Sequence, residues 1–151
     1  SRDKSSPVSR KLWAVLFICY LAGLLCLTLF RKPLGDIWYF LFYRQPSGSI
    51  YHWFGGAFNL VPDFFSHFSR ENLGNILMYL PFGVLYPLSR AHAGWRDTLW
   101  AGLVLILAIE LVQPVFGRSF DANDVILNFS GVLLSTGLFQ LIRHFISTKH
   151  T

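Results

Sequence analysis

The residues from Leu12 to Phe30 constrain the fold of this chain most, because no charged side chain interrupts them. A helix of this length crosses the hydrocarbon core of a bilayer, which is about 30 Å thick. A basic segment precedes the stretch, as in a secretory signal peptide, but the apolar run is longer than a signal-peptide core and no small-x-small cleavage site follows. We therefore interpret 12–30 as a retained membrane anchor.

The composition also favours a membrane protein over a soluble one. Hydrophobic residues make up 53% of the chain and charged residues 14%, a balance more apolar than that of an ordinary soluble domain. The formal net charge of +5 does not indicate a nucleic-acid partner, because the basic residues occur in short clusters between apolar runs and not along one helix face. Membrane topology accounts for these clusters better.

Three more segments have the length and composition of membrane spans. Pro81 lies inside the second, where it predicts a kink, while Pro114 and Gly117 end the third. The predicted fold is an all-α integral membrane bundle of about four transmembrane helices in a single domain, 12–143. The predicted spans are 12–30, 72–88, 97–113 and 124–142, between cytoplasmic tails 1–11 and 144–151.

The segment from Ile37 to Phe68 is rich in aromatic residues and is broken by glycine and proline. Aromatic rings of this kind favour the headgroup layer of a membrane. The longest unbroken piece, Ile37–Tyr43, is too short to cross, so a surface-lying or re-entrant segment is preferred to a fifth span. We predict an aromatic-rich outer loop, entered where Arg31, Lys32, Pro33 and Gly35 stop the first span.

The distribution of Lys and Arg predicts that both termini are cytoplasmic. With the amino terminus inside, eight Lys and Arg residues lie on the cytoplasmic side and five on the outer side. Arg31 and Lys32, which flank the first span directly, favour the opposite orientation. The prediction is therefore a multi-pass membrane protein with both ends on the cytoplasmic side.

Under this topology the start of the second span, the end of the third and the start of the fourth meet at the outer face. Each carries polar residues three or four positions apart, a spacing that places them on one helix face. The candidate ligand-binding residues are Asn72, Asn75, Glu110, Gln113, Arg118, Asp121, Asp124 and Asn128.

Glu110 is the most informative of these residues, because apolar residues on both sides place it within the hydrocarbon layer. An acidic residue at the centre of a membrane helix costs about 2.5–3.5 kcal/mol, so Glu110 should face the bundle, either paired or protonated. Arg118 in the adjacent loop is the expected partner. Ionisable groups within a membrane are functional candidates by default.

Structural explanations compete with a functional one at the other positions. Asn72, Asp121 and Asp124 suit helix caps or first turns, and Asn75 and Asn128 can bond between helices. Glu110, Asp121 and Asp124 could also hold a divalent cation, although Arg118 would compete for the carboxylates. A pair of carboxylates can perform acid–base chemistry, but no nucleophile with an adjacent base is evident.

The remaining candidate groups have simpler interpretations. The five histidines are scattered, and Cys19 and Cys26 lie too far apart on one helix for a disulfide, so we expect no imidazole-bound metal and no cofactor. Gly131 and Ser135 form a small-xxx-small face that favours close helix packing.

These residues also carry a family resemblance. The motifs are Phe58-Asn59-Leu60-Val61-Pro62, Asn72-Leu73-Gly74-Asn75 followed by Pro81-Phe82-Gly83, Glu110 with Gln113, and Gly117-Arg118 followed by Asp121-x-x-Asp124 and Asn128-x-x-Gly131. Over about Phe58 to Leu138 the chain resembles the VanZ-like family of bacterial membrane proteins. Departures are Ser135 in place of a common glycine, the pair Met78-Tyr79, and a short loop after Gly117.

The resemblance implies a multi-spanning envelope protein of the bacterial cytoplasmic membrane, and some members of the family lower sensitivity to teicoplanin-like lipoglycopeptides. No settled biochemical activity follows from it. We expect a binding protein more than an enzyme, with a membrane lipid or a lipid-linked envelope precursor as its partner. The alternatives are an enzyme acting on a lipid headgroup, with Glu110 and Asp124 as acid and base or as metal ligands, and a transporter assembled as a homo-oligomer.

Overall fold

The structure, a computed structural model, describes residues 7–43, 58–63, 66, 68–91 and 93–148. Apart from a two-stranded ladder, the elements in this part of the chain are helical. They are α1 (Pro7–Leu25), a π-helical segment (Cys26–Phe30), α2 (Arg31–Tyr43), β1 (Phe58–Asn59), α3 (Arg70–Ser89), α4 (Trp95–Val112), a 3-10 turn (Gln113–Phe116), β2 (Phe120–Asp121) and α5 (Ala122–Thr148).

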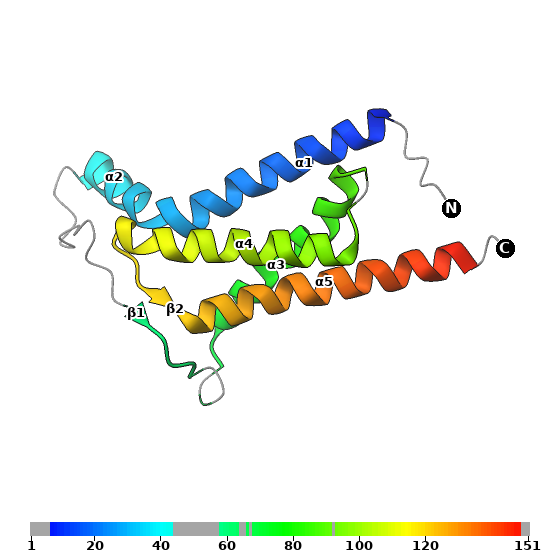
Figure 1. Cartoon of the computed structure of the whole chain (residues 1–151). Coiled ribbons are helices and arrows are strands. Elements are labelled where there is room, and N and C mark those ends of the chain that lie inside the picture. The colour runs from blue at the N-terminus through cyan, green and yellow to red at the C-terminus, as the bar shows by residue number, and fades with distance from the viewer. Residues whose placement is uncertain (1–6, 44–57, 64–65, 67, 92, 149–151) are drawn as a thin grey trace.

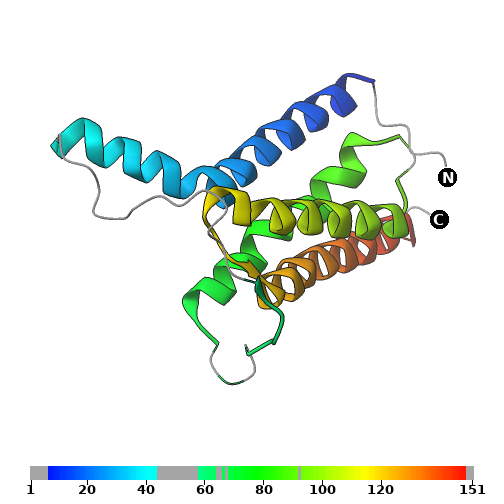
Figure 2. The same cartoon turned by 60° about the vertical axis from the view of Figure 1, so that its left-hand side comes forward.

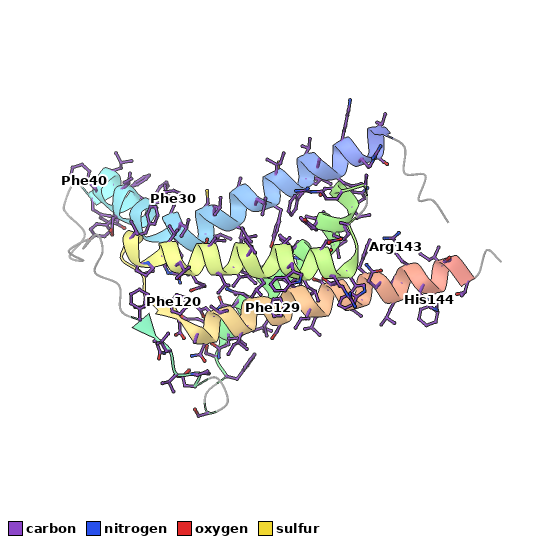
Figure 3. The ribbon with its side chains drawn as sticks, in the orientation of Figure 1. Phe30, Phe40, Phe120, Phe129, Arg143 and His144 are labelled. Carbon is purple, nitrogen blue, oxygen red and sulfur yellow. The ribbon has the colours of Figure 1, made fainter. Side chains whose placement is uncertain are left out.

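Four long helices, α1, α3, α4 and α5, form a bundle in which successive members run in alternating directions (Figures 1 and 2). The start of α1 and the end of α5 lie at one end of the bundle, and α2, the start of α5 and the end of α4 lie at the other. Figure 3 shows the same polarity, with Phe30 and Phe120 at one end and Arg143 and His144 at the other. The predicted all-α membrane bundle is confirmed.

Large apolar side chains cover the outward faces of these helices. Exposed examples occur on every long helix, including Ile18 on α1, Leu77 on α3, Val104 on α4 and Leu138 on α5. In water this surface would be unfavourable, whereas lipid tails solvate it at no such cost.

Three helices in the described part of the chain are long and apolar enough to cross a membrane: Val8–Phe30, Trp95–Phe116 and Ala122–Thr148. The remaining predicted span falls in α3, which has 20 residues but is less apolar, since it contains Asn72, Asn75, Pro81 and Pro87. Helix α3 contacts α1, α4 and α5. Much of its surface is therefore covered by protein, a setting that tolerates polar residues and prolines in a membrane helix.

The apolar span ends at Phe30, but the helix itself continues past Arg31. A π-helical segment, Cys26–Phe30, follows α1, and Arg31 keeps right-handed helical backbone angles, so the chain continues directly into α2. The direction of the helix changes at this segment, and α2 projects away from the bundle (Figure 2). Charged residues remove a helix from lipid but do not by themselves break it. Of the predicted aromatic loop, Ile37–Tyr43 is therefore helical, and 44–57 lies outside the described residues.

The closest helix contact joins α3 and α5 through glycines. A Cβ atom at Gly131 would lie 2.3 Å from the carbonyl oxygen of Ile76, and one at Gly83 would lie 2.0 Å from Ser135 Oγ and 2.6 Å from the Thr136 amide nitrogen. The predicted small-residue face of Gly131 and Ser135 is thus a packing surface, and Ser135 donates back to the Gly131 carbonyl at 2.9 Å.

Two short elements bring the end of α4 and the loop before α3 to the start of α5. The 3-10 turn after α4 contains Pro114 and ends at Gly117, whose φ of 75° is left-handed, as the predicted stop required. The chain then forms β2, which pairs in parallel with β1, Phe58 opposite Phe120 and Asn59 opposite Asp121. Sequence patterning did not predict this ladder, because two residues per strand leave no periodicity.

Gly131→Ala should lower the free energy of unfolding of the detergent-purified protein by about 1–3 kcal/mol, since the added methyl group meets backbone atoms of α3. Gly137→Ala on the same helix is the matched control. Nothing lies within 4 Å of a Cβ at Gly137, so this change should be neutral or stabilise by up to about 1 kcal/mol. Equal effects of the two substitutions on the melting temperature would contradict the close α3–α5 contact.

Candidate functional site

A polar cavity of about 560 Å³ lies where the starts of α3 and α5 meet the π-helical segment and the start of α2. Its volume falls within the range of about 300–1,000 Å³ that small-molecule sites occupy. The lining is mostly polar, with Leu27, Gly74 and Met78 as its nonpolar members. The polar lining residues are Thr28, Arg31, Asp63, Ser69, Glu71, Asn72, Asn75, Arg118, Asp121, Asn123 and Asp124.

The predicted site residues divide into two groups. Five line the cavity, namely Asn72, Asn75, Arg118, Asp121 and Asp124. The other three, Glu110, Gln113 and Asn128, are not in the lining and are 1%, 2% and 2% exposed. The structure thus separates a cavity wall that a ligand can contact from a buried polar layer within the bundle.

One hydrogen bond between α3 and α5 fixes a wall of the cavity. Asn75 Nδ2 donates to Asp124 Oδ1 across the helix interface. Because Asn75 is a neutral donor, it orients the carboxylate of Asp124 and leaves its charge in place. This bond accords with the interhelical role considered for Asn75, and Asp124 is one of the carboxylates that the cavity exposes.

The buried layer is organised around Glu110. Its Oε1 accepts a hydrogen bond from Asn128 Nδ2 at 3.3 Å, while Oε2 is buried with no hydrogen-bond partner among the described residues. The charged groups that act on Glu110 are those of Asp124, Arg118 and Asp121. Glu110 therefore faces the bundle, as its cost in lipid required, and lies behind the carboxylate wall of the cavity.

Further oxygens of this layer also lack partners within the described part of the chain. They are Gln113 Oε1, Asn128 Oδ1, Tyr79 Oη and Thr136 Oγ1. Buried polar groups are normally hydrogen-bonded, so each of these atoms marks a polar position inside the bundle.

Arg118 acts on Glu110 through its charge, as predicted, but the hydrogen bond that it donates goes to another residue. Its Nη1 donates to the carbonyl oxygen of Thr28 at 2.9 Å, and the hydrogen bond to Glu110 comes from Asn128 instead. Thr28 lies in the π-helical segment, where its hydroxyl donates to the Leu24 carbonyl at 2.8 Å. Arg118 thus ties the loop before α5 to the bend of the first helix, which closes one side of the cavity.

The predicted helix caps are partly realised. Asp121 Oδ1 accepts from the Asn123 amide at 2.9 Å at the start of α5, as a capping carboxylate should, and its Oδ2 accepts from Asn59 at 3.5 Å. Asn72 is not the cap of α3. Ser69 holds that position, because its hydroxyl accepts from the Asn72 amide at 3.2 Å and donates to Asn72 Oδ1 at 3.1 Å.

The sequence does not predict several of the residues that line the cavity. Asp63 falls within the predicted aromatic loop, Arg31 at the predicted stop of the first span, and Thr28 within an apolar span. Asp63 shares two hydrogen bonds with Asn123: its amide donates to Asn123 Oδ1 at 2.9 Å, and Asn123 Nδ2 donates back to its carboxylate. Glu71, one residue before Asn72, carried a sequence signal, since it lies on the same polar helix start.

The cavity can recognise both positive and negative groups. Four carboxylates line it, those of Asp63, Glu71, Asp121 and Asp124, and two guanidinium groups, those of Arg31 and Arg118. Among the described residues, no set of three or more His, Cys, Asp or Glu side chains is arranged to hold a metal ion. The idea that Glu110, Asp121 and Asp124 form such a site thus gains no support. The site is built for hydrogen bonds and charge pairing.

Comparison with known proteins identifies relatives of this chain. The model of the VanZ/LLP1 family matches residues 17–143. Protein VanZ of Enterococcus faecium is 30% identical over 136 residues, which cover 89% of this chain and 74% of that protein. No solved structure matches the chain. The family match extends beyond the motifs recognised in the sequence to include the second part of α1, from residue 17 onward.

A double-mutant cycle of Asn75→Ala and Asp124→Ala should reveal a coupling free energy of about 0.6–1.7 kcal/mol in thermal unfolding of the purified protein, the range for hydrogen bonds between membrane helices. The coupling is expected because each substitution removes the same bond. Strictly additive effects would show that the two side chains do not interact.

Proposed function

The chain belongs to the VanZ/LLP1 family, and we propose that it is an envelope protein of the bacterial cytoplasmic membrane whose polar cavity binds a lipid-linked or cell-surface ligand. We place the cavity at the outer face, with both termini in the cytoplasm. The start of α1 and the end of α5 lie at the end of the bundle away from α2 (Figure 1), as this topology requires.

The observation that carries the proposal is a cavity with charges of both signs at one end of a bundle whose outer surface is apolar. Its wall is held by bonds between elements distant in sequence, Asn75 with Asp124 and Arg118 with the carbonyl of Thr28. Stability does not require such a cavity, because apolar packing would close the same end without burying charge. A wall of oriented charges is typical of a binding site.

Binding accounts for the arrangement better than catalysis by a Glu110–Asp124 pair. Glu110 is 1% exposed and absent from the cavity lining, so a substrate in the cavity cannot contact its carboxylate. A general acid must lie within hydrogen-bond reach of the group that it protonates. We therefore assign Glu110 to the support of the wall and Asp124 to ligand contact.

Native mass spectrometry of the protein with its co-purified lipids tests the binding function. Wild-type protein should retain a defined lipid-linked species, and Asp124→Asn should weaken its retention by roughly tenfold, as expected for about 1.4 kcal/mol of lost charge pairing. The substitution keeps an oxygen that can accept from Asn75.

The matched control is Asp97→Asn at the opposite end of the bundle. The Asp97 carboxylate accepts from the Gly94 amide at 2.8 Å, a bond that asparagine can preserve, so retention should equal that of the wild type. If no lipid species is retained, or if both substitutions change retention alike, the cavity is not the ligand site.

We further propose that ligand binding contributes to resistance against teicoplanin-type lipoglycopeptides, a role that the family resemblance suggests. Asp124→Asn should then raise the drug sensitivity of cells that depend on this protein, while its abundance in the membrane stays unchanged. Asn can still accept from Asn75, so the fold should persist. Unaltered sensitivity at equal abundance would exclude the resistance role.

A further inference from the structure

We infer that the cavity takes a lipid headgroup that carries a phosphate and a primary ammonium group a few bonds apart, as phosphoethanolamine does, the phosphate on Arg31 and Arg118 and the ammonium on the carboxylate wall. This inference rests on the proposed binding function and specifies the class of ligand.

The two arginines form a phosphate site on one side of the cavity. Arg31 begins α2 and Arg118 precedes α5, and both also line a second cavity of about 420 Å³ together with Gly35 and Asp36. The two cavities therefore adjoin at these guanidinium groups. Arg118 Nη1 donates to the Thr28 carbonyl, which fixes the position of the guanidinium group. A guanidinium group has five N–H donors, so it can also bind an oxyanion.

The carboxylates form the cation-binding side. The hydrogen bonds given to Asp63, Asp121 and Asp124 by side chains come from the neutral amides of Asn123, Asn59 and Asn75. Neutral donors orient the carboxylates without compensating their charge. The charge of Arg118 offsets part of that of Asp124, while Asp121 and, to a smaller extent, Glu71 add negative charge to the same wall.

The balance of charge favours a ligand with a cationic group over a simple anion. Four carboxylates face two guanidinium groups in the lining. A phosphate alone would pair with the arginines but would be repelled by the surrounding carboxylates. A ligand that adds an ammonium group satisfies both sides.

Helix α2 indicates that the ligand is carried by the membrane. It starts at the phosphate side and displays exposed aromatic side chains, among which Trp38 and Phe42 pack at 4.2 Å between ring centroids and Tyr39 and Tyr43 at 4.6 Å. Tyr and Trp favour the headgroup layer of a bilayer. The arginine side of the cavity therefore lies at the depth of lipid headgroups, and Leu27 and Met78 in its lining can contact the start of an acyl chain.

The test measures lipid binding to the full chain, purified and delipidated in detergent, by native mass spectrometry. Phosphatidylethanolamine should bind about tenfold more tightly than phosphatidylglycerol, which has the phosphate but no amine, a difference typical of one charge-assisted contact. Equal affinities, or tighter binding of phosphatidylglycerol, would overturn the inference. Soluble phosphoethanolamine binding as tightly as the lipid would show that the ligand is not lipid-borne and would overturn that part.

Variants separate the two sides of the site. The double substitution Glu71→Gln with Asp124→Asn should bring the two lipids to similar affinities, because it removes two charges of the ammonium side. Arg31→Gln should weaken the binding of both lipids to a similar extent, since both carry the phosphate. The substitution leaves the hydrogen bond from Arg118 to the Thr28 carbonyl intact. Asp97→Asn should change neither value. A preference for the amine that survives the double substitution would also overturn the inference.

The results that would contradict the headgroup assignment differ from those that would contradict the binding function. If another lipid-linked species co-purifies and is lost on Asp124→Asn, the cavity is a ligand site and only the headgroup assignment is wrong. If no species is retained at all, the binding function itself is wrong.

Discussion

The close contact between α3 and α5 is the constraint on which the site depends. Gly83 and Gly131 let the two helices approach so near that backbone atoms of one helix occupy the space of a side chain on the other. In a membrane, where lipid removes the hydrophobic drive for helices to associate, such close van der Waals packing is a main source of association. The same approach brings Asn75 within bonding distance of Asp124 and thereby sets one wall of the cavity.

A second constraint is that charged and polar side chains must be kept out of the hydrocarbon layer. Glu110 and Asn128 are buried against each other between α4 and α5, and the carboxylates nearer the bundle end are turned into the cavity. Both arrangements keep charge away from hydrocarbon, where it would cost several kcal/mol. The cavity thus gathers carboxylates and guanidinium groups at one end of the bundle, and these groups give the site its capacity to recognise a ligand of mixed charge.

The bend of the first helix links the fold to the site. Residues of the π-helical segment do not follow the regular α-helical hydrogen-bond pattern, and the Thr28 carbonyl within it accepts from Arg118. Such segments occur often at functional positions. Here the bend turns α2 away from the bundle, places Arg31 at the cavity and leaves the aromatic face of α2 exposed. The π-helical segment therefore positions both the Arg31 guanidinium group and the exposed aromatic face of α2.

The sequence by itself determined the helical membrane character, the approximate position of three long apolar helices, the stop at Pro114 and Gly117, and the burial of Glu110, because each follows from the cost of placing charge or open backbone in lipid. The eight candidate residues do gather at one end of the bundle. Only the tertiary structure decided which of them reach the cavity, that Asn128 and not Arg118 bonds Glu110, and that Ser69 caps α3 in place of Asn72. The same holds for Asp63 and Arg31, whose place at the site depends on contacts between segments distant in sequence. Helical periodicity assigns a side chain to a face, but its partner across an interface depends on how the helices cross, and no single segment encodes that angle.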